Sequence, residues 1–152
     1  MLVMKYLDIG NEIYHGTLNN FDPKDINEPS WFTIEEEQSI KWVFYKYNKL
    51  NKSDNTGYIH KFELIKIPNL INLDIETNLR LEINAYGNHK FSQKIKNGDF
   101  GNYDGYINLE DQAEIMLIEP LKFIKIVSSK NINVLMNKSL KYTKTKFGWR
   151  LI

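Results

Sequence analysis

Three groups of residues have the types and spacing to do chemistry on a small ligand. His15 stands beside a glycine and a hydroxyl in the run Ile-Tyr-His-Gly-Thr. Glu114 begins the run Glu-Ile-Met-Leu-Ile, where a carboxylate would sit at the mouth of a buried strand. Trp31 precedes a predicted helix that carries Trp42, and the two indole rings could form a flat-walled slot for a planar ring.

Each group taken alone also fits an ordinary structural role. A single histidine beside glycine is more often a hydrogen-bonded structural residue, a strand-end glutamate is commonly a surface charge, and tryptophans mostly pack in cores. His60 and His89 carry no further signal, and none of the three histidines pairs with another at metal-ligand spacing. The sequence therefore does not predict a metal site.

The clearest element that must position these residues is a helix beginning near Thr33 and ending before a polar turn at residues 51–57. Thr33 and Glu36 have the spacing of a capping box, and residues 35–37 are all acidic, which the dipole at a helix start favours. Apolar residues then recur at intervals of three and four, which gives the helix one face to pack on a sheet. These residues are Ile40, Val43, Phe44, Tyr47 and Leu50.

The rest of the pattern predicts mostly strands. Strand-like runs occupy residues 12–17, 58–67, 70–73, 103–107, 114–118 and 123–127, and residues 147–152 could add an edge strand. Residues 77–86 predict a second helix, whereas residues 87–101 predict a mobile loop that could contain a short helical turn. This order predicts an α+β fold in which helices pack on a sheet. No stretch has the composition of a linker, so we expect residues 1–152 to form a single domain.

Composition excludes several classes of site and function. The chain has 152 residues, 42% of them hydrophobic, which is enough for the core of one domain. Zero cysteines exclude disulfides, thiolate metal sites and cysteine nucleophiles. A formal charge of +1 does not predict the basic stripe typical of nucleic-acid binding. Because neither a membrane-length apolar run nor a signal peptide is evident, we expect a soluble cytoplasmic monomer without a membrane partner.

Taken in order along the chain, the three groups resemble the motifs of the ADP-ribosyltransferase-like fold, in the His-Tyr-Glu branch of diphtheria-toxin-like toxins and poly-ADP-ribose polymerases. The first motif of that branch is a strand ending in Tyr-His-Gly-Thr, and it matches Tyr14, His15, Gly16 and Thr17. The second is an aromatic-Phe-Thr strand end followed by a small residue and an aromatic on a helix, and it matches Trp31, Phe32, Thr33, Ser39 and Trp42. The third is a strand like Tyr-Asp-Gly-Tyr-Ile, a short loop and a strand that begins with glutamate, and it matches residues 103–107 and Glu114.

This resemblance implies a fold, a substrate and residue roles. The fold would be an α+β, ADP-ribosyltransferase-like split β-sheet core with flanking helices, and the substrate would be NAD⁺, without a metal. Glu114 and His15 would be the catalytic residues: Glu114 would bond the 2′-hydroxyl of the nicotinamide ribose, and His15 a ribose hydroxyl of the adenosine half. The Gly16 backbone would pair with the nicotinamide carboxamide. The other NAD⁺-binding positions would be Tyr14, Thr17, Trp31, Phe32, Thr33, Ser39 and Trp42.

Two features qualify the resemblance. The branch usually has tyrosine where this chain has Trp31, so a hydrogen bond from a phenolic hydroxyl at that position is not predicted. Asp111 and Gln112 precede Glu114 on the loop that faces the acceptor in many members of this fold, and ordinary solvated loop residues fit them equally well.

The resemblance implies an enzyme, a mono-ADP-ribosyltransferase that is a glycosyltransferase acting on NAD⁺. It would cleave the nicotinamide glycosidic bond and transfer ADP-ribose to a protein or nucleic-acid acceptor that the sequence does not identify. A small single domain fits a toxin-like effector, including a viral or phage one, which would act in the host-cell cytoplasm. Two alternatives stay open: an NAD⁺ glycohydrolase of the same fold, and a non-catalytic module that binds ADP-ribose or a partner.

Overall fold

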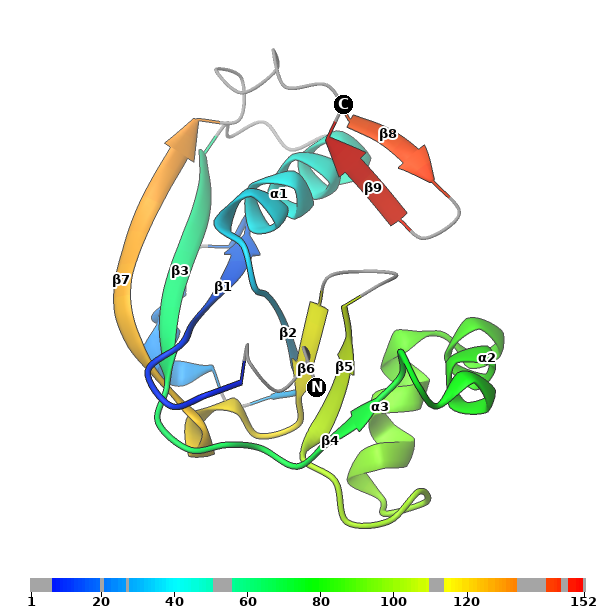
Figure 1. Cartoon of the computed structure of the whole chain (residues 1–152). Coiled ribbons are helices and arrows are strands. Elements are labelled where there is room, and N and C mark those ends of the chain that lie inside the picture. The colour runs from blue at the N-terminus through cyan, green and yellow to red at the C-terminus, as the bar shows by residue number, and fades with distance from the viewer. Residues whose placement is uncertain are drawn as a thin grey trace.

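A seven-stranded sheet forms the centre of the molecule (Figure 1). The computed structural model describes residues 7–19, 21–26, 28–50, 56–109, 114–133, 142–145 and 148–151. In chain order, the strands of the sheet are β1 (Glu12–Thr17), β2 (Ser30–Thr33), β3 (Thr56–Leu64), β4 (Leu70–Asn72), β5 (Gly105–Asn108), β6 (Glu114–Leu117) and β7 (Ile124–Asn133). They lie in the order β4-β5-β6-β2-β1-β3-β7, and every neighbouring pair is antiparallel except β4 and β5.

Helices accompany this sheet, and the α+β class predicted from the sequence is confirmed. They are α1 (Glu36–Leu50), α2 (Thr77–Tyr86) and α3 (Asn88–Lys96), with short 3₁₀ turns η2 (Pro23–Asp25) and η3 (Pro120–Lys122). Figure 1 shows α1 lying across β1 and β3, whereas α2 and α3 lie beside β4 and β5. Strands β8 (Tyr142–Thr145) and β9 (Gly148–Leu151) form a separate antiparallel hairpin, and β9 contacts α1.

The sheet is nearly divided between β1 and β2. These two strands share one paired position, Tyr14 with Thr33, whereas β1 and β3 share six and β2 and β6 share four. We call β4, β5, β6 and β2 the β6 half-sheet, and β1, β3 and β7 the β1 half-sheet. Because so little pairing joins the half-sheets, side chains of both can line a space between them.

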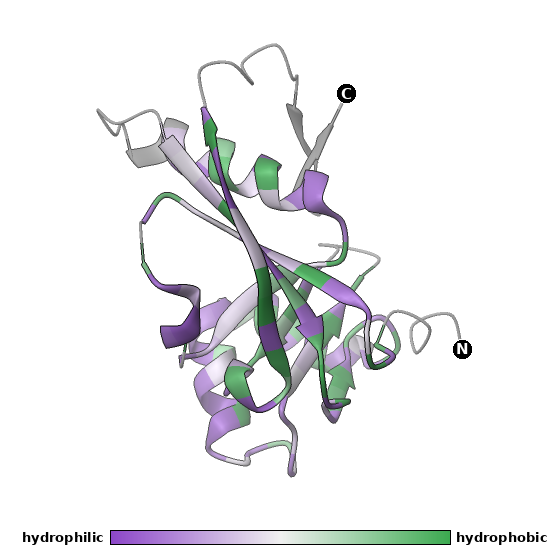
Figure 2. Cartoon of the chain, turned by 90° about the vertical axis from the view of Figure 1, so that its left-hand side faces the viewer, coloured by the Kyte–Doolittle hydropathy of each residue, from purple (hydrophilic) through white to green (hydrophobic). Residues whose placement is uncertain are grey.

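Packing holds the half-sheets together around buried apolar side chains. One cluster joins Phe32 and Ile115 of the β6 half-sheet to Ile13 and Phe62 of the β1 half-sheet. A second cluster includes residues of α2 and α3, and a third includes residues of α1. Figure 2 shows hydrophobic and hydrophilic residues following one another along the strands, as expected where the two faces of a strand differ in environment.

Residues 88–96 form a helix, although the sequence predicts a loop there. Phe91 and Ile95 lie one turn apart on α3, and both are buried in the same cluster as Ile83 of α2. Gly87 lies between the two helices with a φ of +87°, a backbone conformation that glycine adopts easily. The prediction was wrong because the polar and glycine-rich composition concealed this pair of apolar residues.

The start of α1 and the last strand also differ from the prediction. Thr33 ends β2, and its hydroxyl donates to the Glu35 carbonyl instead of accepting a helix amide, so α1 begins at Glu36 without the predicted capping box. Residues 148–151 pair with β8 and not with an edge of the main sheet. In the described part of the chain, no helix has the length and apolar character to cross a membrane.

Candidate functional site

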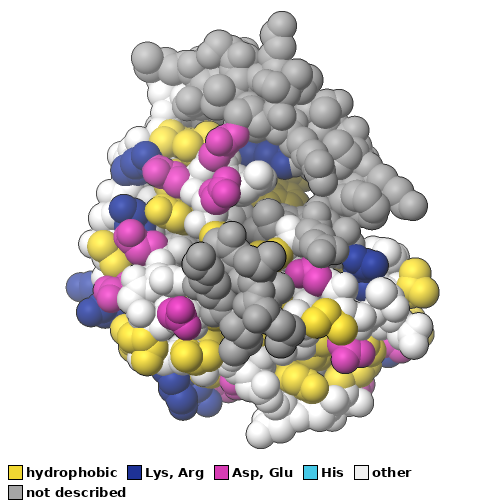
Figure 3. Space-filling view, viewed as in Figure 1, with side chains coloured by type: hydrophobic (Ala, Val, Ile, Leu, Met, Phe, Trp, Pro, Cys, Tyr) yellow, Lys and Arg dark blue, Asp and Glu magenta, His cyan; other side chains and the backbone are white. Residues whose placement is uncertain are grey.

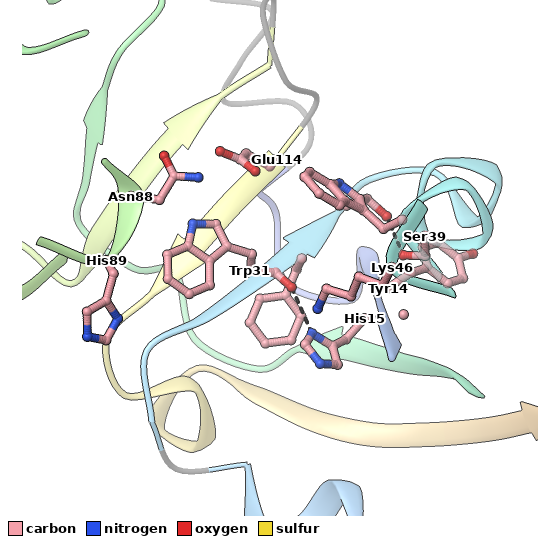
Figure 4. Close-up of a pocket in the computed structure, with 12 residues that line it drawn as sticks. Tyr14, His15, Trp31, Ser39, Lys46, Asn88, His89 and Glu114 are labelled. Atoms are coloured by element: carbon pink, nitrogen blue, oxygen red, sulfur yellow. Dashed lines mark hydrogen bonds between the residues drawn. The ribbon is translucent and has the colours of Figure 1, made fainter. Parts of the chain in front are cut away.

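A pocket of about 320 Å³ lies where the two half-sheets part (Figure 4). Its lining comes from β1 and β2, from the first residue of β6, from one face of α1 and from the start of α3. The lining residues are Tyr14, His15, Gly16, Trp31, Phe32, Thr33, Ser39, Trp42, Lys46, Asn88, His89 and Glu114.

The three sequence motifs meet in this pocket. Of the candidate residues that the structure describes, all except Thr17 line it. Thr17 is buried, and its Oγ1 accepts a hydrogen bond from the backbone N–H of Asn19 at 3.1 Å. Its side chain therefore belongs to the turn after β1. Asp111 and Gln112, the predicted acceptor-facing residues, lie outside the described residues.

Glu114 places a buried carboxylate at the start of β6. Its exposed fraction is 2%, and its Oε1 accepts the hydroxyl proton of Tyr106 at 3.1 Å. Burial disfavours the charged form and raises the pKa of Glu114 to about 7, although the hydrogen bond from Tyr106 acts in the opposite direction. The carboxyl group can therefore gain or lose its proton near neutral pH.

A chain of hydrogen bonds links Trp31 to Glu114 through Tyr106. The Trp31 indole Nε1 donates to the Tyr106 hydroxyl oxygen at 2.7 Å. Strand pairing places these side chains on one face, because Met116 is the register partner of both Trp31 and Tyr106 and lies two residues from Glu114. Sequence reasoning misses Tyr106, although its place in Tyr-Asp-Gly-Tyr-Ile, one strand before Glu114, was the available signal.

His15 presents a neutral imidazole to the pocket. Its Nδ1 lies 2.8 Å from the Trp31 backbone carbonyl, which can only accept, so Nδ1 carries the proton and Nε2 is free to accept. Burial is the largest cause that lowers the pKa of His15 to about 4, and the charge of Lys46 adds to it. His15 therefore offers a hydrogen-bond acceptor to a ligand hydroxyl.

Ser39 is oriented by its hydrogen bond with Thr33. The two hydroxyl oxygens lie 2.6 Å apart, and Thr33 donates its only hydroxyl proton to the Glu35 carbonyl at 2.9 Å. Ser39 must therefore be the donor in the pair. Its lone pairs then stay available to accept a hydrogen bond from an N–H group of a ligand.

Gly16 allows α1 to lie close to β1. A Cβ atom at this position would stand 2.4 Å from the Ser39 carbonyl oxygen and 2.8 Å from Val43 Cγ2. Any side chain would therefore push α1 away, together with Ser39 and Trp42. This close packing explains the glycine at position 16 without reference to any ligand.

Three residues of the lining were not predicted: Lys46, Asn88 and His89. Asn88 and His89 begin α3, the helix that the sequence conceals. Lys46 lies seven residues after Ser39 and four after Trp42 on α1, and this spacing on one helix face could have identified it.

Lys46 is the one lysine or arginine among the lining residues, and desolvation lowers its pKa. Within the described part of the chain it forms no ion pair with an acidic side chain. Figure 4 shows Glu114 and Asn88 on one side of Trp31, and His15 and Lys46 on the other. The pocket thus has a carboxyl group toward one end and an ammonium group toward the other.

No family model, curated protein or solved structure matches the chain. Among the described residues, no group of three or more His, Asp or Glu side chains is arranged to hold a metal ion. On the described surface in Figure 3, Lys and Arg side chains are interspersed with Asp and Glu.

Proposed function

We propose that the protein is an NAD⁺-dependent mono-ADP-ribosyltransferase with an ADP-ribosyltransferase-like fold. One observation carries the proposal: three motifs far apart in the sequence line a single pocket that contains a buried carboxylate. The near division of the sheet between β1 and β2 supports the fold, because the resemblance implies a split sheet.

The charges of the pocket complement those of NAD⁺. The dinucleotide has a cationic nicotinamide ring at one end and an anionic diphosphate farther along. Glu114 suits the cationic end, and Lys46 suits the diphosphate. Trp31 and Trp42 offer electron-rich ring faces to the nicotinamide.

The free hydrogen-bonding groups of the pocket suit the rest of the molecule. His15 Nε2 can accept a ribose hydroxyl, and the Ser39 oxygen can accept an N–H of the nicotinamide carboxamide. These contacts would fix the dinucleotide in one orientation, which is the main requirement for breaking its glycosidic bond.

The reaction needs charge stabilisation more than acid or base chemistry. The C–N bond to nicotinamide breaks with both electrons passing to the ring nitrogen, so nicotinamide leaves neutral and needs no proton. Positive charge develops on the ribose, and ionised Glu114 stabilises it by accepting the 2′-hydroxyl through the oxygen not bonded to Tyr106. The acceptor then attacks C1′ and releases its proton to solvent.

Nicotinamide release from NAD⁺ tests this proposal. Wild type and Glu114→Gln are compared at pH 8, with Glu63→Gln as control, because Glu63 pairs with Lys125 and does not line the pocket. We expect Glu114→Gln to lower the rate roughly 10²- to 10³-fold and Glu63→Gln to change it little. Equal rates in wild type and Glu114→Gln would refute the proposal.

Repeating the assay with a cell lysate separates transfer from hydrolysis. Release that needs both lysate and Glu114, with ADP-ribose found on a macromolecule by mass spectrometry, indicates a transferase. Release that needs Glu114 but no lysate indicates a glycohydrolase. No release, with ADP-ribose still bound, indicates a binding module.

A further inference from the structure

We infer that Tyr106 is a positioning residue that holds Glu114 with one oxygen toward the pocket and favours its ionised form, and that Trp31 sets the direction of the Tyr106 hydroxyl. The inference rests on the proposed function only for the identity of the group that Glu114 meets. The hydrogen-bonded chain itself can be tested without a substrate.

The direction of this chain follows from the donors available. An indole N–H can only donate, so the Tyr106 oxygen must accept from Trp31 at 2.7 Å. The hydroxyl has one proton, and it points to Glu114 Oε1 at 3.1 Å. The order of donation is therefore fixed from Trp31 to Tyr106 to Glu114.

Packing prevents the Tyr106 hydroxyl from turning away. Tyr106 is fully buried, and its ring makes an edge contact with Phe91 of α3 at 5.8 Å between centroids. At the preceding residue, a Cβ on Gly105 would stand 1.7 Å from the Met116 carbonyl oxygen, so β5 lies against β6 at a distance that only glycine allows. Tyr106 is thus held by β6 through the strand pairing and by α3 through Phe91.

This arrangement assigns different tasks to the two oxygens of Glu114. Oε1 is occupied by Tyr106, which leaves Oε2 for a substrate hydroxyl. If Glu114 is protonated while Tyr106 still donates to Oε1, the proton sits on Oε2, which becomes a donor and a much weaker acceptor for a ligand hydroxyl. Loss of the Tyr106 hydroxyl removes a donor that favours the carboxylate, so it should raise the pKa of Glu114 further.

Other titratable groups share the pocket with Glu114. Tyr14 and His15 reach it from β1, Lys46 from α1 and His89 from α3. His15 is held neutral by its burial. His89 is exposed, so the pH profiles described below are also measured in a His89→Gln background.

The first test follows the Trp31 indole N–H by ¹⁵N–¹H NMR from pH 5 to 9 in the ligand-free protein, with Trp31→Phe to assign its signal. We expect the signal to titrate with a midpoint near 7, because the indole senses Glu114 through Tyr106. Glu114→Gln should abolish the titration. A flat Trp31 signal in wild type, or an unchanged titration in Tyr106→Phe, overturns the inference.

The second test is the pH profile of nicotinamide release. Tyr106→Phe should move the acidic limb of kcat up by roughly one pH unit, which lowers the rate about tenfold at pH 6 and little at pH 9. Tyr103→Phe is the matched control, since Tyr103 belongs to the same sequence run and, among the described residues, forms no hydrogen bond with Glu114. A Tyr106→Phe loss that is equal at every pH would show a merely structural role and reject the inference.

The two tests separate failure of the inference from failure of the proposed function. If Trp31 titrates through Tyr106 but wild type releases no nicotinamide, the hydrogen-bonded chain stands and the NAD⁺ proposal fails. If NAD⁺ is cleaved but neither readout depends on Tyr106, the proposed function stands and this inference is rejected. If Tyr106→Phe does not fold, a flat Trp31 signal in wild type still overturns the inference.

Discussion

The β6 half-sheet and the β1 half-sheet with α1 contribute opposite kinds of group to one pocket. Glu114 in the β6 half-sheet is 2% exposed and reaches Trp31 through the buried Tyr106. On the other side, His15 is kept neutral, and Lys46 lies on α1 as a cation whose pKa is lowered by desolvation, without an ion pair among the described residues. The buried hydrogen bonds of β5 and β2 thus determine the state of the carboxyl group, whereas the place of α1 on the sheet determines where the cation lies.

The largest expected effect comes from changing Glu114 in the β6 half-sheet, and it concerns the free energy of unfolding. The pKa of Glu114 is about 7 in the fold against 4.5 for the free group, so the unfolded chain loses its proton first as pH rises. Folding therefore becomes less favourable between about pH 4.5 and about pH 7, by up to about 3 kcal/mol. Glu114→Gln should have a larger free energy of unfolding than wild type at pH 8, measured in urea, and the gap should close toward pH 4.5.

Glu63→Gln serves as the control for this experiment, because Glu63 is partly exposed and paired with Lys125 on the surface. It should show no such pH-dependent gap. If the free energies of unfolding of Glu114→Gln and wild type differ by the same amount at pH 8 and pH 4.5, burial does not raise the pKa of Glu114 as described.

The next effect comes from the β1 half-sheet, where a substitution at Gly16 would disturb the contact between α1 and β1. Gly16→Ala should lower the free energy of unfolding by about 1 to 3 kcal/mol and weaken NAD⁺ binding, because the new Cβ meets the Ser39 backbone. The Trp31 indole signal should keep its titration, since the β6 half-sheet is not in that contact. Urea denaturation and the NMR titration check both parts.

Gly57 offers a matched comparison for Gly16. A Cβ at Gly57 would stand 2.4 Å from Val43 Cγ1, a side-chain atom, whereas at Gly16 the nearest atom is backbone. Adding Val43→Ala should therefore rescue Gly57→Ala more than Gly16→Ala. Equal rescue of both would show that the Ser39 backbone contact does not matter.

The smallest expected effect is on ligand affinity, and it distinguishes the Lys46 end of the pocket from the Glu114 end. Lys46→Gln, in the non-turnover Glu114→Gln background, should weaken NAD⁺ binding roughly tenfold and leave nicotinamide binding unchanged, because nicotinamide has no phosphate. Calorimetry with both ligands measures this, with Lys125→Gln as control. An equal loss of affinity for both ligands would contradict the proposal that Lys46 binds the diphosphate.

Part of the site could be predicted from sequence because its residues occur in recognisable local runs. The Tyr14–Thr17 run, the Trp31–Thr33 run and Glu114 are each marked by their neighbours, and the structure brings all of them except Thr17 to one pocket. Strand and helix patterns likewise predicted the α+β class. What local patterns could not supply was the pairing between distant strands.

Tyr106 shows this limit most clearly. The hydroxyl that accepts the Trp31 indole hydrogen bond belongs to a residue 75 positions away, and only the register of β2, β6 and β5 brings the two together. Lys46 was missed for a milder reason, because a lysine on a helix is ordinarily a solvated charge. The helix α3 was missed because only two buried apolar residues, Phe91 and Ile95, define its packed face.

The central claim is that the pocket between the half-sheets binds NAD⁺ with its nicotinamide ribose at Glu114 and its diphosphate at Lys46, and a crystal structure of the Glu114→Gln variant with NAD⁺ tests it most directly. The account predicts the nicotinamide ring against Trp31 and Trp42, the 2′-hydroxyl of its ribose within hydrogen-bond distance of residue 114, and the diphosphate beside Lys46. NAD⁺ bound in the reverse orientation, or outside this pocket, would contradict the account.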